Sequence, residues 1–126
     1  MRINSSVSAD GATGILAIEG DFFSVEDSQK LVDQVNSFVE RGIKNIVLDM
    51  SGTRTLNSMG VGSLVRAFAA VRRLNGKVAL AGASKKFSDV MQITRLQSIF
   101  PSYATVADAV AELNIGSSLE KPSAGA

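Results

Sequence analysis

Hydroxyl, amide and carboxylate side chains are concentrated between Asp49 and Gly62, in the sequence DMSGTRTLNSMGVG. This segment follows the short apolar run Ile46–Leu48, which is typical of a strand buried on both faces, and it precedes a pattern typical of an amphipathic helix. In open α/β sheets, ligands and partners meet the fold where the carboxyl end of a strand leads into a helix. The segment is therefore the first candidate for a functional site.

Asn57 and Ser58 stand where this helix is expected to begin. Both residue types are good N-caps, and the N–H groups of a helix start favour an anion. A phosphate on Ser58 would be stabilised there and would add roughly −1.5 to −2 charges to the surface. A simpler interpretation stays open, in which Ser58 only caps the helix while Gly60 and Gly62 allow close packing.

Few residues in this chain could carry out catalysis. The 126 residues include no histidine and no cysteine, which excludes disulfides, a thiolate nucleophile and a Ser-His-Asp triad. The stretch Gly60–Gly62 lacks the third glycine of a dinucleotide-binding fingerprint. Carboxylates such as Asp21 and Asp49 belong to no evident pair of base and nucleophile. We therefore expect a binding protein without cofactor or metal, and not an enzyme.

Composition and charge restrict the class of protein further. Hydrophobic residues make up 45% of the chain and charged residues 20%, as in ordinary globular domains. The 13 Lys and Arg residues against 12 Asp and Glu residues give a net charge of +1, which predicts no strong attraction to nucleic acid or to an anionic membrane. No apolar stretch reaches the roughly 18 residues of a membrane span, and the start of the chain lacks a signal-peptide pattern. We expect a cytoplasmic protein with no direct membrane insertion.

Strand-like and helix-like patterns alternate along the chain. The expected elements are a hairpin of Arg2–Ala9 and Ile15–Ile18, a helix from Ser24 to Gly42, strand Ile46–Leu48, a helix from Asn57 to about Leu74, strand Val78–Ala81, a helix capped by Ser84, a short strand beginning at Ile99–Phe100 with Pro101 at its edge, and a helix capped by Thr105. This order predicts a single α/β domain with a mainly parallel sheet, an antiparallel N-terminal edge hairpin and about four helices packed over one sheet. The domain is expected to span residues 1–115, followed by a flexible C-terminal tail of residues 116–126.

The helix after Ser58 has a predicted apolar face and a predicted polar face. The apolar face comprises Val61, Leu64, Val65, Phe68 and Val71. The opposite face carries Ser63, Arg66, Ala70 and Arg73. The basic residues Arg72, Arg73, Lys77, Lys85 and Lys86 are expected to be solvated surface, because no aromatic residues are interleaved with them.

Four stretches of the chain resemble a known family in order and spacing. They are Ile46–Gly52, Ser58–Leu64 after a gap of five residues, Lys77–Gly82, and Val90–Leu96 with Phe100 after it. Together they resemble the STAS domain family, and within it the small stand-alone anti-sigma factor antagonists. The resemblance covers the chain from about Ile15 to Leu113 and implies the STAS-type α/β fold.

The resemblance also implies a mechanism of regulation. Such antagonists bind an anti-sigma factor, often an ATP-dependent serine-protein kinase, which then releases its sigma factor so that transcription starts. The kinase phosphorylates the antagonist at a helix start, the modified antagonist dissociates, and a phosphatase reverses the change. A phosphate at such an interface adds desolvation cost and like-charge repulsion. We expect a monomer or a weak homodimer.

The chain departs from the family pattern at the phosphate acceptor. The family loop typically has Asp-Ser-Ser-Gly, or Thr in third place, and the acceptor stands directly before Gly. The residues here are Asn57-Ser58-Met59-Gly60, and Met59 cannot be phosphorylated. Ser58 becomes the candidate phosphorylation site, with Ser63 and Ser51 as weaker candidates.

A second departure lies upstream. The family has an acidic residue at the end of a Gly-x-x-Asp segment, where this chain has Phe23, with Asp21 close by. The candidate partner-binding residues are Asp21, Phe23, Ser24, Asn57, Ser58, Met59, Gly60, Gly62, Ser63 and Arg66. Two functions stay open: an antagonist regulated by phosphorylation, and a phosphorylation-independent STAS interaction module that acts as a scaffold, a constitutive antagonist or a subunit of a transport system.

Overall fold

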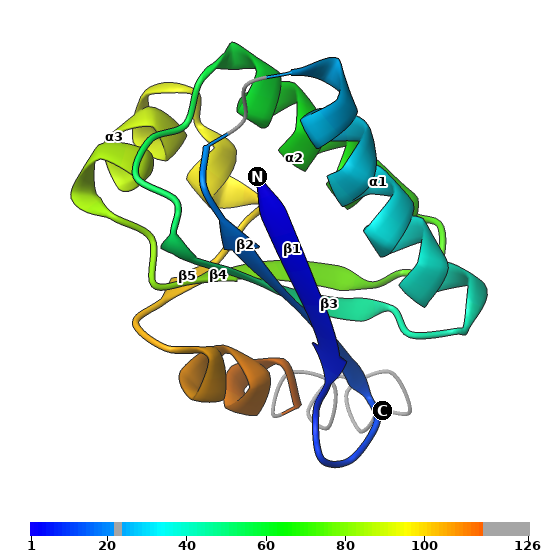
Figure 1. Cartoon of the computed structure of the whole chain (residues 1–126). Helices are drawn as coiled ribbons and strands as arrows, with labels where there is room; N and C mark the ends of the chain where they lie inside the picture. Colours follow the sequence, from blue (N-terminus) through cyan, green and yellow to red (C-terminus); the bar gives the residue numbers. More distant parts are fainter. Residues whose placement is uncertain (22–23, 115–126) are drawn as a thin grey trace.

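A five-stranded mixed sheet forms the centre of the molecule (Figure 1). The computed structural model describes residues 1–21 and 24–114. Its elements are β1 (Arg2–Val7), β2 (Thr13–Glu19), α1 (Val25–Glu40), β3 (Asn45–Gly52), α2 (Ser58–Arg72), β4 (Lys77–Ala81), α3 (Lys85–Ile93), the 3₁₀ turn η1 (Leu96–Ser98), β5 (Ser102–Tyr103) and a helix at residues 106–114. The strand order is β1-β2-β3-β4-β5, with β1 antiparallel to β2 and all other neighbours parallel. The predicted fold class is confirmed, while the predicted tail, 116–126, lies outside the described residues.

Helices cover both faces of this sheet. In Figure 1, α1 and α2 lie on one face and the helix at residues 106–114 lies on the other. Successive side chains of a strand point to opposite faces. Ile46, Leu48 and Met50 of β3 therefore join the larger core, together with α1 and α2. Val47 packs with Ala109 in the smaller core on the opposite face.

The predicted helix starts are confirmed by their capping bonds. Ser24, Ser84 and Thr105 each accept the backbone N–H of the residue three positions on, at 3.1 Å. Such bonds satisfy backbone donors that have no partner within the helix. The end of α1 is also as expected, because Gly42 has a φ of 80°, the left-handed conformation that closes many helices.

Strand β3 is longer than predicted. The sequence predicts that the strand ends at Leu48 and that a loop runs from Asp49 to Asn57, but Asp49 pairs with Ala17 of β2 and with Ala81 of β4. Its neighbour Met50 is fully buried. Pairing with β4 as far as Asp49 and with β2 as far as Gly52 extends the strand through residues whose own pattern is not that of a strand. The loop before α2 is therefore only five residues, 53–57.

The inward face of α2 also differs from the prediction. Val65 is 43% exposed, whereas Ser63 and Ala70, expected to be on the polar side, are buried. Small side chains allow α2 to pack closely against α1, and the Ser63 hydroxyl has hydrogen-bond partners there. Packing between the helices, and not the hydrophobicity of single residues, sets the rotation of α2.

The last strand lies slightly later than predicted. It comprises Ser102 and Tyr103, while Phe100 turns into the core, where it is 1% exposed. Pro101 precedes the strand and its carbonyl oxygen accepts the N–H of Leu80 at 2.8 Å. Within the described ranges, no helix has the length and apolar character needed to cross a membrane.

Candidate functional site

The loops that follow β2 and β3 are joined to each other. The carboxylate oxygen Oδ1 of Asp21 accepts the backbone N–H of Arg54 at 3.1 Å and that of Thr55 at 3.3 Å. These two donors come from the middle of the loop that precedes α2. One carboxylate, two residues beyond the end of β2, therefore holds the loop that precedes α2.

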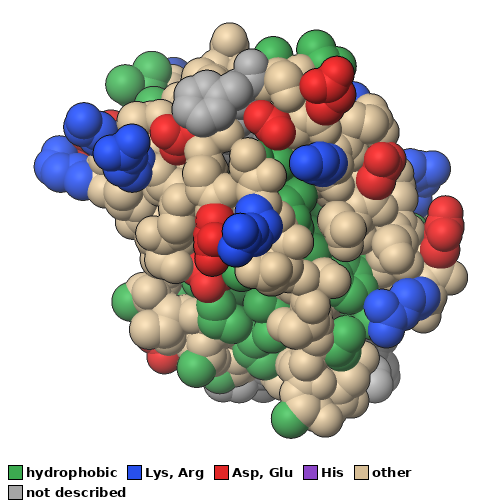
Figure 2. All heavy atoms as spheres, viewed as in Figure 1, with side chains coloured by type: hydrophobic (Ala, Val, Ile, Leu, Met, Phe, Trp, Pro, Cys, Tyr) green, Lys and Arg blue, Asp and Glu red, His purple; other side chains and the backbone are tan. Residues whose placement is uncertain are grey.

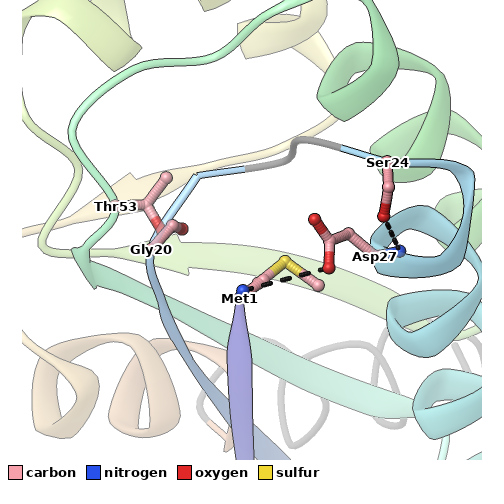
Figure 3. A network of polar contacts seen from close by, with 5 residues as sticks. All are labelled: Met1, Gly20, Ser24, Asp27 and Thr53. Atoms are coloured by element: carbon pink, nitrogen blue, oxygen red, sulfur yellow. Dashed lines mark hydrogen bonds and ion pairs between the residues drawn. The ribbon is translucent and has the colours of Figure 1, made fainter.

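The side chain of Thr53 makes a second connection between the end of β2 and the loop that precedes α2. The hydroxyl of Thr53, which is 1% exposed, lies 3.2 Å from the carbonyl oxygen of Ile18 and 3.1 Å from that of Gly20. Figure 3 shows Thr53 directed at Gly20 at the end of β2. Leu56, also buried, anchors the other end of the same loop in the larger core. The five-residue loop thus has a fixed course into α2.

Helix α2 begins with an exposed serine. Asn57 is the N-cap, and its side-chain oxygen accepts the N–H of Gly60 at 2.9 Å. Ser58 is consequently the first residue of the helix, and it is exposed. The interpretation of Ser58 as the cap is wrong: Asn57 has that role, so the hydroxyl of Ser58 is not needed for capping.

Charge differs between the two neighbouring helix starts. The first turn of α1 contains Glu26 and Asp27, whereas the first turn of α2 contains no acidic residue. In Figure 2, red side chains lie over α1 at the upper right, and a blue group projects over α3 at the left. An anion at the start of α2 would thus interact with the positive end of the helix without a carboxylate in the same turn.

Three polar side chains join α1 to α2 behind this start. The guanidinium of Arg66 donates through Nη2 to Ser28 Oγ. Ser28 Oγ lies 2.5 Å from Ser63 Oγ, which is 2.8 Å from the carbonyl oxygen of Met59. Because each hydroxyl has a single hydrogen, these contacts are satisfied together when Ser28 donates to Ser63 and Ser63 donates to the Met59 carbonyl. The chain of bonds runs from an exposed cation to the first turn of α2.

The start of α1 makes one further polar contact. The N-terminal ammonium group of Met1 lies 3.9 Å from Oδ1 of Asp27, and Ser24 caps the same turn (Figure 3). Asp27 is 9% exposed. This ion pair connects the beginning of β1 to the beginning of α1, beside the loop that contains Asp21.

Ser51, a weaker phosphorylation candidate, lies away from these residues. Its hydroxyl donates to Oδ1 of Asp49 at 2.7 Å, and its N–H donates to the same oxygen at 3.1 Å. Both residues alternate with Met50, so their side chains point to the face of the sheet opposite α1 and α2. The sheet separates Ser51 from Ser58.

The remaining candidates fall into two groups. Asp21, Ser24, Asn57, Ser58, Met59, Gly62 and Arg66 are exposed or half-buried around the starts of α1 and α2. Gly60 and Ser63 are buried, so they support this surface and do not form it. Phe23 lies outside the described residues. Sequence reasoning missed Ser28 and Thr53, because only the packing of α1 on α2 and of β2 beside β3 shows what these hydroxyls contact.

Nothing in the described ranges resembles a metal centre. Residues 1–21 and 24–114 contain no group of three or more Asp, Glu, His or Cys side chains placed to hold an ion. The arrangement offers instead a preformed surface with one exposed hydroxyl at a helix start. Such a surface can bind a protein partner and can accept a charged modification.

Comparison with known proteins agrees with this fold. The sequence model of the STAS domain family matches residues 4–109. The TM1081 homolog of Thermotoga neapolitana, described by name as an anti-sigma factor antagonist, is 27% identical over 78 residues, which are 62% of this chain and 69% of that protein.

Two solved structures share the same fold. The crystal structure of TM1081 from Thermotoga maritima superposes with a TM-score of 0.78 at 22% identity, covering 89% of this chain and 94% of that one. The Bacillus cell fate determinant SpoIIAA in its phosphorylated form gives a TM-score of 0.69 at 15% identity, covering 88% of this chain and 98% of that one. The family match spans every described element except the end of the final helix and the first residues of β1. This chain belongs to the STAS domain family.

Proposed function

We propose that this chain is an anti-sigma factor antagonist, which binds an anti-sigma factor and thereby releases a sigma factor. It acts by binding and not by turnover. The contact is made by the α2-start surface, which we define as Asp21, Ser24, Asn57, Ser58, Met59, Gly62 and Arg66. The observation that carries the proposal is the pair of bonds from Arg54 and Thr55 to Asp21, which joins two loops into one surface beside Ser58.

Rigidity of this surface favours protein binding. Ordering loops and long side chains on association costs free energy, and a preformed surface avoids part of that cost. Here the loop before α2 is held by Asp21, by Thr53 and by the bond that Ser84 Oγ donates to the Arg54 carbonyl at 2.7 Å. The Arg66 side chain is likewise held by its bond to buried Ser28.

We further propose that phosphorylation of Ser58 controls the contact. The hydroxyl is exposed and Asn57 does the capping, so a kinase can modify Ser58 without removing a bond that starts the helix. The helix start stabilises the added phosphate. A partner packed against the same residues then meets desolvation cost and new charge, which weakens binding. The relative SpoIIAA, which has a phosphorylated form, supports this proposal.

Met59 favours a second candidate function. It occupies the position at which the family usually has its phosphate acceptor, and its thioether has no hydroxyl to modify. A STAS module that binds its partner irrespective of phosphate, as a scaffold, a constitutive antagonist or a transport-system subunit, is consistent with this residue. The two functions differ in how partner binding responds to ATP.

The test combines a pull-down of bound proteins with an intact-mass measurement of the chain. The tagged protein is incubated in lysate of its own cells with and without ATP, and bound proteins and phosphate are identified by mass spectrometry. We expect capture of an anti-sigma factor kinase without ATP, its loss with ATP, and one phosphate on Ser58. With the purified partner, Ser58→Glu should weaken binding at least tenfold, equivalent to about 1.4 kcal/mol.

Matched variants make the result specific. Ser51→Ala should still be phosphorylated, because Ser51 lies on the other face of the sheet. Met59→Ser restores the usual acceptor and should add a second modifiable position. An anti-sigma factor captured equally with and without ATP, with no phosphate on the chain, would establish the second function. Capture of no anti-sigma factor under either condition would contradict the antagonist role.

A further inference from the structure

The two edges of the described sheet differ in length and in protection. The edge strand β5 has only two residues, and Pro101, which lacks a backbone N–H, directly precedes it. The opposite edge strand, β1, has six residues and contains neither a proline nor a bulge. A long, regular edge is a template for another strand, because its outward backbone groups have no partner within the sheet. The sheet can therefore be extended at β1 (Figure 1).

One hydrogen bond near the hairpin turn fixes which backbone groups of β1 point away from β2. The N–H of Ser8 donates to the carbonyl oxygen of Thr13, the residue opposite, at 2.9 Å. In an antiparallel pair, residues that bond to the neighbouring strand alternate with residues that do not. Counting back from Ser8, every second residue of β1 bonds to β2. The residues between them direct their N–H and C=O groups outward, and these are Ile3, Ser5 and Val7.

Charge does not protect this edge. Natural edge strands often carry lysines or inward-pointing charges that repel an added strand. The single charged residue of β1 is Arg2, whose guanidinium lies 3.8 Å from the carboxylate of Glu19 on β2. The rest of the strand is uncharged. An additional strand beside β1 would therefore meet no repulsion from β1 itself.

A groove of about 340 Å³ lies between the start of β1 and helix α1. Its lining residues are Met1, Arg2, Ile3, Lys30 and Gln34. Ile3 and Val7 pack against the larger core, so their side chains, with that of Ser5 between them, are on the sheet face that α1 covers. A strand added beside β1 would place the side chain opposite Ile3 on this same face, next to the groove.

We propose that two copies of this chain pair through β1 in antiparallel orientation and join their five-stranded sheets into one. The register places Ser5 opposite Ser5 of the second copy, and Ile3 opposite Val7 of the second copy. Both members of each pair have outward backbone groups, so each pair exchanges two hydrogen bonds. Ser5 then lies on the two-fold axis of a symmetric dimer.

The sequence of β1 matches itself in this register. Ile3 meets Val7 on the α1 face, so that Val7 of the second copy lies beside the groove, and Asn4 meets Ser6 on the other face. Arg2 is opposite Ser8, so no like charges oppose each other. A shift by two residues would instead place Ser5 opposite Ile3 or Val7. A second copy is the favoured occupant because it supplies this matching strand.

The test measures the association of the full chain by sedimentation equilibrium over a range of protein concentrations. We expect a monomer–dimer equilibrium. Ser5→Lys places two like charges opposite each other and should weaken the dimer at least about tenfold. Ser88→Lys adds the same charge at an exposed position of α3 and should leave the dissociation constant unchanged. A mixture of Ser5→Lys with Ser5→Glu should restore association, because opposite charges then meet.

Engineered cysteines test the register, since the chain has none of its own. In the proposed dimer the Cα atoms of the two Ser5 residues are about 5.5 Å apart, within the range of a disulfide. The two Ser6 residues are offset along the strands, and their Cα atoms are about 8 Å apart, which is too far. Ser5→Cys should therefore cross-link on oxidation much faster than Ser6→Cys.

Further controls separate this dimer from a folding defect and from the proposed function. Ser5 is exposed, so the thermal unfolding of Ser5→Lys at low concentration should match that of the unmodified chain. Ser58→Glu should leave the dissociation constant of the dimer unchanged, so a failed antagonist role and a failed dimer are distinguishable. A chain that stays monomeric at every concentration, or equal cross-linking of Ser5→Cys and Ser6→Cys, would overturn the proposal.

Discussion

Asp21 and Arg54, which are 33 positions apart in the chain, are joined by a hydrogen bond of 3.1 Å from the backbone N–H of Arg54 to Oδ1 of Asp21. The same oxygen accepts from Thr55. The bonds connect the ends of two adjacent parallel strands at the edge from which α1 and α2 begin. The α2-start surface therefore has a defined shape before any partner binds.

Removal of the Asp21 carboxylate should loosen this surface. We expect Asp21→Ala to lower the free energy of unfolding by about 1–2 kcal/mol, since two backbone donors lose their acceptor. Amide exchange at Arg54 and Thr55 should become faster, while exchange in the core of β3 changes little. Asp21→Asn retains an acceptor oxygen and should have a smaller effect; equal effects of the two variants would show that the bonds do not hold the loop.

The serine pair between α1 and α2 should behave as one unit. Ser63→Ala removes a hydroxyl that is 0% exposed, and the expected loss is about 1–3 kcal/mol in urea unfolding. Ser28→Ala should cost a similar amount. In the double variant the losses should not add, with a coupling of at least about 0.5 kcal/mol. Strict additivity would mean that the 2.5 Å contact does not contribute to stability.

Two glycines should respond in opposite directions to the same substitution. A Cβ on Gly62, which is exposed within α2, meets nothing within 4 Å, so Gly62→Ala should stabilise the fold by about 0.5–1 kcal/mol. Gly76→Ala should destabilise it strongly, because its Cβ would collide with the Lys44 carbonyl oxygen. Thermal unfolding of both variants measures the contrast, and an unchanged midpoint for Gly76→Ala would contradict the tight turn before β4.

Acid should weaken the β1–β2 hairpin through Asp10. The hydroxyl of Ser8 donates to its carboxylate at 2.6 Å, and this bond, followed by that from the N–H of Ala12, lowers the pKa of Asp10 below the ordinary value of 3.8. A lowered folded-state pKa contributes stability that is present above pH 3.8 and is lost as the pH falls through the folded value.

The measurement compares the chain with Asp10→Asn across that range. Asp10→Asn should be the less stable protein near neutral pH, and the difference in urea midpoint should shrink as the pH is lowered below 3.8. Because Asp10 is fully exposed, we expect the difference to be small. A difference in urea midpoint that grows on acidification would contradict the lowered folded-state pKa of Asp10.

Much of the architecture could be predicted from local patterns. The caps at Ser24, Ser84 and Thr105, the hairpin turn and the buried runs Ile46–Leu48 and Val78–Ala81 each depend on near neighbours. Alternating strands and helices then imply a mainly parallel sheet, because each helix is expected to form a right-handed crossover between two parallel strands. The resemblance to the STAS family agreed with this order.

The predictions from sequence were wrong where contacts with neighbouring strands and helices override the local hydrophobic pattern. Met50 lies in the core because β4 pairs with the strand as far as Asp49 and β2 pairs with it as far as Gly52, so the alternation of side chains continues through Met50. Val65 is exposed and Ser63 buried because close packing on α1 favours the smaller side chain. Hydrophobicity alone predicts the reverse for both helix residues.

The sequence by itself determined the fold class, the helix starts, the position of Ser58 near a helix start and the absence of histidine and cysteine chemistry. These properties follow from residue identity and from contacts within a few positions. Only the tertiary structure decided that Asp21 accepts hydrogen bonds from the loop before α2, and that Ser28 contacts Ser63 across 35 positions. Hydrogen bonds and close packing between distant segments depend on how strands and helices meet in space, which no local pattern specifies.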